Sequence, residues 1–205
     1  MEVTIVDFGM GNLASIPNML KRLDATTLIT SDPVEIAKAR RLILPGVGSF
    51  DAAMRNIESR GFIPVLRQKA FDERIPILGV CLGMELLADR SDEGGLAGLG
   101  WVPGSVVRFD PAVTDPPLRV PHMGWNTLVT KRDVPLLRDL GDGARFYFAH
   151  SYHLVCDDPL DVAASTTYGR EFTCAVQRDN VMGIQFHPEK SHRFGLRVFA
   201  NFLAL

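Results

Sequence analysis

A cysteine between two glycines follows an apolar run near the middle of the chain. The segment IPILGVCLGMELL, residues 75–87, reads as a buried strand up to Cys81, and a helical pattern begins directly after it. In parallel α/β sheets reactive groups gather beyond the carboxyl ends of strands, where a tight turn exposes one side chain. Gly79 and Gly83 permit close backbone approach, and the start of a helix favours thiolate over thiol. We therefore expect Cys81 to be a nucleophile, the alternative being an inert buried cysteine.

A nucleophilic cysteine needs a base, and the base needs a group that orients it. The segment GIQFHPEKS, residues 183–191, offers His187 at the end of an apolar strand that Pro188 stops. Because residues two apart in an extended chain face the same way, His187 and Glu189 are expected to point into one site, with the carboxylate fixing the imidazole. The alternative is a surface histidine and glutamate in a turn, paired with Lys190.

Two further histidines compete for the role of base. His150 and His153 lie in the segment HSYH, within a longer predicted β run over residues 145–155. Being three apart in an extended chain, they are expected to face opposite sides. That spacing also argues against a metal pair, so no metal site is predicted.

The first half of the chain alternates strands with helices, which predicts a parallel sheet covered on both faces. The predicted strands are 3–8, 26–30, 41–50 and 76–81, and the predicted helices are 13–23, 31–39, 50–59, 62–74 and 82–88. Pro17 weakens the first of these helices, whereas Ser31 or Asp32 is expected to cap the second, with Pro33 near its first position.

The second half has turn residues and short β runs, and a closing amphipathic helix over 191–205. A hairpin is predicted over residues 172–186, turning at 178–180. We expect one domain over residues 1–205, of the α/β class: a mostly parallel central sheet flanked by helices, with an antiparallel β subregion in the second half.

Composition excludes several classes of protein. The 205 residues are 46% hydrophobic and 22% charged, with a formal charge of -2, which argues against a nucleic-acid partner or an anionic membrane. An odd cysteine count without Cys-x-x-Cys spacing argues against a disulfide framework and a structural zinc site, and it fits a reducing cytoplasm. The cysteines are Cys81, Cys156 and Cys174. Neither a signal peptide nor a membrane span is expected.

The motifs around the three candidate catalytic residues carry a family resemblance. GVCLGM and FHPEKS resemble the class I glutamine amidotransferases, and further motifs resemble, in the same order, the HisH family, the glutaminase subunit of imidazole glycerol phosphate synthase. These motifs are DFGMGN at 7–12, LPGVGSFDAAM at 44–54, GLGW at 98–101, VPHMGWN at 120–126 and YFAHSY at 147–152. The resemblance covers essentially the whole chain and implies a flavodoxin-like fold, with no cofactor.

The resemblance implies roles for these residues. Cys81 would attack the side-chain amide carbon of L-glutamine, His187 would move the proton, and Glu189 would hold His187. The expected oxyanion donors are the backbone N–H of Leu82 and one from the PGVG loop, at Val47 or Gly48. The residues expected to contact substrate are Gly46, Glu85, Ser151 and Tyr152. The alternatives for PGVG are a turn that ends a strand and a phosphate loop, and no Gly-Lys-Ser/Thr follows to support a phosphate loop.

Glu85 departs from the family pattern, which usually has glutamine there. An ionised Glu85 would repel the α-carboxylate of the substrate, although it could accept from the α-ammonium. Three alternatives follow. Glu85 is protonated, or glutamine binds in a slightly different position, or the affinity for glutamine is reduced.

A chain of this length has no room for a synthase site, so the ammonia must pass to a partner. The resemblance implies a HisF-type TIM barrel partner in histidine biosynthesis, low activity for the isolated chain, and Asn12, Trp125 and Tyr147 as interface residues. The two aromatic residues could equally belong to the core. A related alternative is a paralog that supplies ammonia to amidate a bacterial surface sugar, and an alternative of another class is a non-catalytic regulatory subunit.

Overall fold

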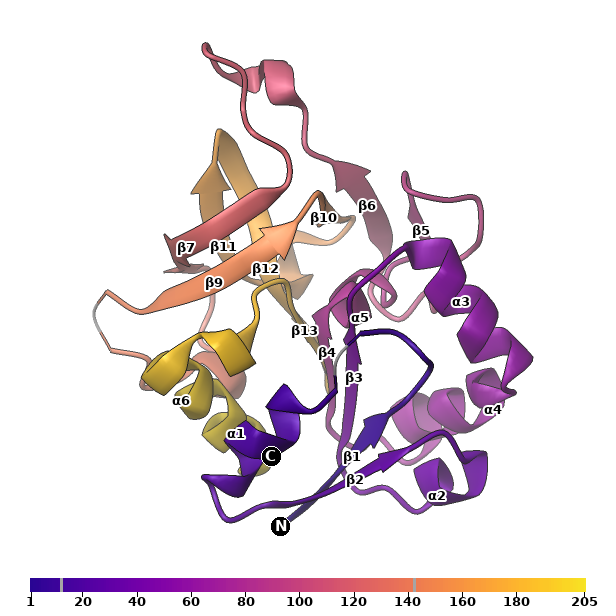
Figure 1. The fold of residues 1–205 in the computed structure, drawn as a ribbon. Helices are drawn as coiled ribbons and strands as arrows, with labels where there is room; N and C mark the ends of the chain where they lie inside the picture. Colours follow the sequence, from indigo (N-terminus) through magenta and orange to yellow (C-terminus); the bar gives the residue numbers. More distant parts are fainter. Residues whose placement is uncertain (12, 142) are drawn as a thin grey trace.

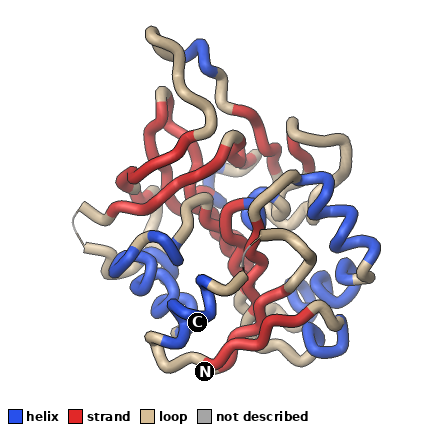
Figure 2. Tube along the Cα trace, in the orientation of Figure 1, coloured by secondary structure: helices blue, strands red, loops and turns tan. Residues whose placement is uncertain are grey.

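The computed structural model describes residues 1–11, 13–141 and 143–205. Within them, a central eight-stranded sheet has the order β2-β1-β3-β4-β13-β12-β11-β8 (Figures 1 and 2). The first five strands in this order run parallel and the last three antiparallel, which confirms the predicted α/β class. The strands are β1 (Glu2–Val6), β2 (Thr26–Thr30), β3 (Leu42–Gly46), β4 (Ile77–Cys81), β8 (Val129–Thr130), β11 (Val162–Tyr168), β12 (Arg170–Arg178) and β13 (Val181–Ile184).

Helices cover both faces of the sheet because side chains on its parallel strands alternate between two apolar layers. On β3, for example, Ile43 enters one core and Leu44 the other. The first core also takes α1 (Ser15–Lys21) and α6 (His192–Leu203). The second takes α2 (Pro33–Ala37), α3 (Phe50–Ser59), α4 (Phe62–Arg67) and the π-helical turn η1 (Gln68–Asp72) (Figure 1).

The sequence predicted most of these helices closely. Pro17 is tolerated because it lies in the first turn of α1, where a backbone N–H has no helical partner. Asp32 caps α2, its side chain accepting from the Val34 N–H at 2.9 Å. The helix after Cys81, α5 (Leu82–Glu85), is much shorter than the predicted 82–88.

The second half adds small sheets above the carboxyl ends of the parallel strands (Figure 1). One contains β5 (Arg90–Ser91), β6 (Gly104–Arg108) and β10 (Tyr152–Cys156), and the other pairs β7 (His122–Thr127) with β9 (Arg145–His150). Their pairs are antiparallel, as predicted, except for the parallel pair β5–β6. The predicted continuous run over 145–155 is wrong, because the chain breaks at Ser151 and its two halves join different sheets.

Four 3-10 turns complete the described part of the chain. Each begins with a proline, whose fixed φ suits the first helical position. They are η2 (Pro111–Val113), η3 (Pro135–Leu137), η4 (Pro159–Asp161) and η5 (Pro188–Lys190). No helix in the described part of the chain combines the length and the apolar character needed to cross a membrane.

Candidate active site

Cys81 occupies the tight turn between β4 and α5. Its φ of 54° and ψ of -112° are unusual for a residue with a side chain, and such strain often marks a functional position. Gly83 is needed because an added Cβ would collide with the carbonyl oxygen of Leu44 on the neighbouring strand. An added Cβ at Gly79 would likewise collide with the Gly83 backbone. Both glycines therefore allow the close backbone approach that the sequence predicted.

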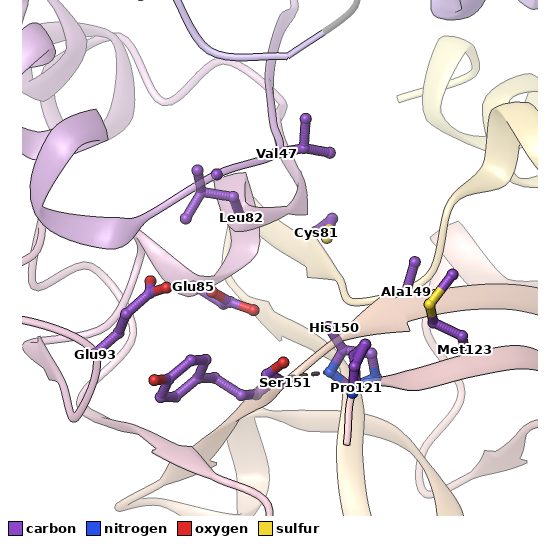
Figure 3. A pocket seen from close by; sticks show the side chains of 12 residues that line it. Val47, Cys81, Leu82, Glu85, Glu93, Pro121, Met123, Ala149, His150 and Ser151 are labelled. Atoms are coloured by element: carbon purple, nitrogen blue, oxygen red, sulfur yellow. Dashed lines mark hydrogen bonds between the residues drawn. The ribbon is translucent and has the colours of Figure 1, made fainter. Parts of the chain in front are cut away.

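The turn opens onto a cleft of about 280 Å³, which suits a small molecule of amino-acid size. Figure 3 shows side chains from both halves of the chain converging there. The lining residues are Val47, Gly48, Cys81, Leu82, Glu85, Glu93, Pro121, Met123, Ala149, His150, Ser151 and Tyr152.

The structure brings His187 and Glu189 together as a buried pair. His187 Nδ1 lies 2.8 Å from Glu189 Oε1, and a carboxylate there is an acceptor, so Nδ1 carries the proton. Nε2 is consequently a lone-pair nitrogen, and it is buried without a hydrogen-bond partner in the described part of the chain. The expected extended geometry was wrong, because Glu189 reaches back from the 3-10 turn η5.

Ser191, which the sequence analysis missed, fixes the backbone of this pair. Its Oγ donates to the carbonyl of His187 at 2.6 Å and accepts from the N–H of Tyr147 at 3.0 Å. The N–H of His187 in turn donates to the carbonyl of Tyr147 at 2.8 Å. These bonds anchor the imidazole to β9.

The environment of Cys81 favours the thiol, contrary to the expected thiolate. Burial raises the pKa of the Cys81 thiol strongly, and the nearby Glu85 carboxyl raises it further. A hydrogen bond from the Leu82 N–H opposes this shift, but α5 has only four residues and a weak dipole. Proton removal from sulfur therefore requires a base.

Cys81 and His187 do not form a hydrogen bond among the described residues. His187 and Glu189 border a second cavity of about 30 Å³, and Val47 lines both this cavity and the main cleft. The Glu189 carboxyl contributes to the raised pKa of Cys81, which shows that the two groups are close enough to interact. The resting geometry is thus open and must tighten before proton transfer.

His150 lines the cleft, but both of its ring nitrogens are engaged. Nδ1 lies 2.6 Å from the carbonyl of Tyr152 and so donates to it, which leaves Nε2 to accept from His122 Nδ1 at 3.0 Å. Burial lowers the pKa of His150 to about 3 and that of His122 to about 4. His150 is therefore a poor candidate base.

The expectation that His150 and His153 face opposite sides was wrong. Their ring centroids lie 5.2 Å and 4.8 Å from that of Phe109, so both pack on one aromatic side chain. The break at Ser151 turns the chain between them. No group of three or more metal-ligating side chains occurs among the described residues.

The predicted oxyanion loop borders the cleft at Val47 and Gly48. Gly48 has a φ of 126°, a conformation that favours glycine, and an added Cβ would collide with the Met10 side chain. Val47 is 48% exposed. Both residues line the same cleft as Leu82, and Figure 3 shows the side chains of Val47 and Leu82 near each other there.

The other predicted substrate contacts divide between the two cavities. Ser151 and Tyr152 line the cleft, but the Ser151 carbonyl accepts from the Phe109 N–H at 3.0 Å, and the Tyr152 carbonyl accepts from His150. Each carbonyl thus already accepts one hydrogen bond from within the chain. Gly46 lines the second cavity and not the main cleft.

Glu85 also lines the cleft and is only 5% exposed, with its Oε1 accepting from Gln185 Nε2 at 2.9 Å. Burial raises the pKa of Glu85 to about 8. The sequence analysis missed both Gln185 and Glu93, a second carboxyl in the cleft whose Oε2 accepts from the Phe50 N–H at 2.7 Å. A signal was available for Gln185, which comes two residues before His187.

The predicted interface residues lie beside the cleft on the paired strands β7 and β9. Trp125 is 46% exposed, which argues against a core role, and Tyr147 is half-buried opposite it. Trp125 also stacks on His192, with ring centroids 5.4 Å apart. Asn12 lies outside the residues that the structure describes.

Comparisons with known proteins identify the family of the chain. Residues 4–205 match the family model described as Glutamine amidotransferase class-I. The chain is 46% identical over 203 residues to Imidazole glycerol phosphate synthase subunit HisH 2 of Pseudomonas aeruginosa, covering 99% of both chains. It is 48% identical over 201 residues to the HisH subunit of Sulfurimonas denitrificans, covering 98% of this chain and 96% of the relative. A solved glutamine amidotransferase, 19% identical, shares the fold with a TM-score of 0.75 over 98% of this chain and 97% of that one.

Proposed function

The chain belongs to the class I glutamine amidotransferase family and, within it, to the HisH subunits of imidazole glycerol phosphate synthase, and we propose that it hydrolyses L-glutamine and delivers the ammonia to a synthase partner. The observation that carries this proposal is the His187–Glu189 pair, whose unpartnered Nε2 is a base available to Cys81. Intact catalytic side chains argue against a non-catalytic regulatory subunit.

The reaction follows from the roles that the geometry allows. His187 Nε2 takes the proton of Cys81 as the sulfur attacks the side-chain amide carbon of glutamine. The N–H groups of Leu82 and of the Val47–Gly48 loop stabilise the oxyanion. His187 returns the proton to the departing ammonia, which leaves a glutamyl thioester. His187 then activates water, which releases glutamate and restores the thiol.

The partner in this proposal is a HisF-type TIM barrel that uses the ammonia in histidine biosynthesis. The subunit names of the relatives support a partner, and the exposed Trp125 with the half-buried Tyr147 offers an aromatic surface beside the cleft. The protonated thiol and the open Cys81–His187 geometry support low activity without that partner. We place the protein in the cytoplasm, with residues 1–205 as one catalytic domain, and its unpaired cysteines fit that compartment.

Reconstitution tests the proposal. Glutamate release should be low for the chain alone and should rise about 10²-fold or more when the barrel partner and its ribonucleotide are added, because binding would tighten the open Cys81–His187 geometry. Cys81→Ala should abolish release and still bind the partner. Glutamate release by Cys81→Ala would refute the mechanism, and full turnover by the isolated chain would refute the coupling. Stimulation only by a sugar-amidating synthase would move the acceptor to the surface-sugar pathway.

A further inference from the structure

The mechanism gives no role to Glu85, a buried ionisable residue of the cleft. Glu85 lies one helical turn beyond Cys81, and its carboxyl group is directed into the space that substrate would fill (Figure 3). The basic side chains that the structure describes form no ion pair with it. A buried carboxyl without a cation is destabilised in its ionised form.

Gln185 engages one oxygen of this carboxyl group. Its Nε2 lies 2.9 Å from Glu85 Oε1 and 4.0 Å from Cys81 Sγ, so one amide lies beside both groups. With Oε1 accepting from Gln185, a proton on Glu85 belongs on Oε2. No hydrogen bond to Oε2 occurs among the described residues, so an Oε2 hydroxyl is free to donate into the cleft.

Among the described residues that line the cleft with Glu85, no titratable side chain supplies a positive charge. Glu93, from the loop after β5, raises the pKa of Glu85. Cys81 carries a thiol, Tyr152 a phenol, and His150 an imidazole that burial keeps neutral. The α-carboxylate of a bound amino acid would add a like charge to this space, which a neutral Glu85 would accept and an ionised one would repel.

We propose that Glu85 is a specificity-determining residue that binds the α-carboxylate of glutamine as a neutral carboxylic acid, with Oε1 held by Gln185 and the Oε2 hydroxyl as donor. The proposal rests on the proposed glutaminase function and assigns Gln185 as the positioning residue. A glutamine side chain at position 85 would offer the same acceptor and donor without being able to ionise. In this chain the group that contacts the α-carboxylate therefore has a charge that depends on pH.

The test compares wild type with Glu85→Gln, each in complex with the barrel partner. KM and kcat for glutamine are measured at pH 7 and pH 9. Ionisation of Glu85 around pH 8 should make the ratio of KM at pH 9 to KM at pH 7 about tenfold larger in wild type than in the variant. Glu85→Gln is the matched control because both proteins share the titration of the substrate ammonium group.

Two variants give opposite shifts that a purely structural role would not produce. Gln185→Leu removes a hydrogen bond that favours the ionised carboxylate, so KM should begin to rise at a higher pH. Glu93→Gln removes a negative charge, so KM should begin to rise at a lower pH.

Equal KM ratios in wild type and Glu85→Gln, or tighter wild-type binding at pH 9, would overturn the proposal. Loss of turnover in both proteins would instead count against the glutaminase function. In that case glutamine is titrated calorimetrically into Cys81→Ala, with and without Glu85→Gln, at pH 7 and pH 9. The ratio of the dissociation constants at the two pH values then replaces the ratio of KM values and needs no catalysis.

Discussion

The His187 region and the aromatic cluster around His150 both bury imidazoles, but they leave the ring nitrogens in different states. In the first region a carboxylate takes the Nδ1 proton and Nε2 stays open. In the second region His122, His150 and a backbone carbonyl form a closed chain of hydrogen bonds. Aromatic rings surround that chain, with His122 stacked on Tyr168 at a centroid distance of 4.0 Å.

This comparison shows that burial alone does not identify a base. In the second region burial lowers the pKa of both His122 and His150. Only His187 has a carboxylate to stabilise the imidazolium that forms when it accepts a proton. The aromatic cluster packs neutral histidines behind the cleft, and His150 thereby fixes the carbonyl of Tyr152 at the cleft wall.

Glu189→Gln should have the largest effect on the difference between the two regions. A glutamine amide can donate to Nδ1 and thereby move the ring proton to Nε2, and it cannot stabilise the imidazolium. We expect kcat with the partner to fall about 10²-fold or more, with the melting temperature little changed. Glu58→Gln, on an exposed position of α3, is the matched control and should keep wild-type kcat. A Glu189→Gln enzyme that kept more than a tenth of its kcat would remove the distinction between the two regions.

A smaller effect is expected from His153, whose ring packs against Phe109 and Phe172 and whose two nitrogens form no hydrogen bond among the described residues. Burial lowers the pKa of His153 to about 4, below its unfolded value. The unfolded chain therefore binds a proton first as pH falls, so stability is lost from about pH 6.5 down to about pH 4.

His153→Phe should remove this loss without breaking a hydrogen bond. Between pH 8 and pH 5 the free energy of unfolding should fall by about 2 kcal/mol less in the variant than in wild type. Urea denaturation at the two pH values measures the difference. An equal fall in both proteins would mean that His153 does not titrate on unfolding.

Local patterns predicted the parallel half of the fold well, because strands and helices there follow their own periodicity. Residues 26–30 form β2 and residues 50–59 form α3, at the predicted bounds. The sharp turn at Cys81 was also readable, because Gly79 and Gly83 mark the close approach of two backbones. The protonation state of the Cys81 thiol could not be predicted from local patterns, because it depends on burial and on Glu85.

The missed features depend on contacts between distant segments. Glu93 binds the N–H of Phe50, 43 residues earlier, and Gln185 binds Glu85, 100 residues earlier. No local period encodes such pairs. The break at Ser151 has a similar origin, because the apolar pattern is continuous while β9 and β10 pair with different strands.

In the proposed mechanism His187, and not His150, is the base that serves Cys81. The most direct measurement is the rate at which a chloroketone analogue of glutamine alkylates the complex with its partner, with the modified cysteine identified by mass spectrometry. We predict labelling at Cys81, with Cys156 and Cys174 spared. Labelling should slow about 10²-fold in His187→Ala and stay within about tenfold of wild type in His150→Phe. Normal labelling in His187→Ala with slow labelling in His150→Phe, or modification at Cys174, would contradict this mechanism.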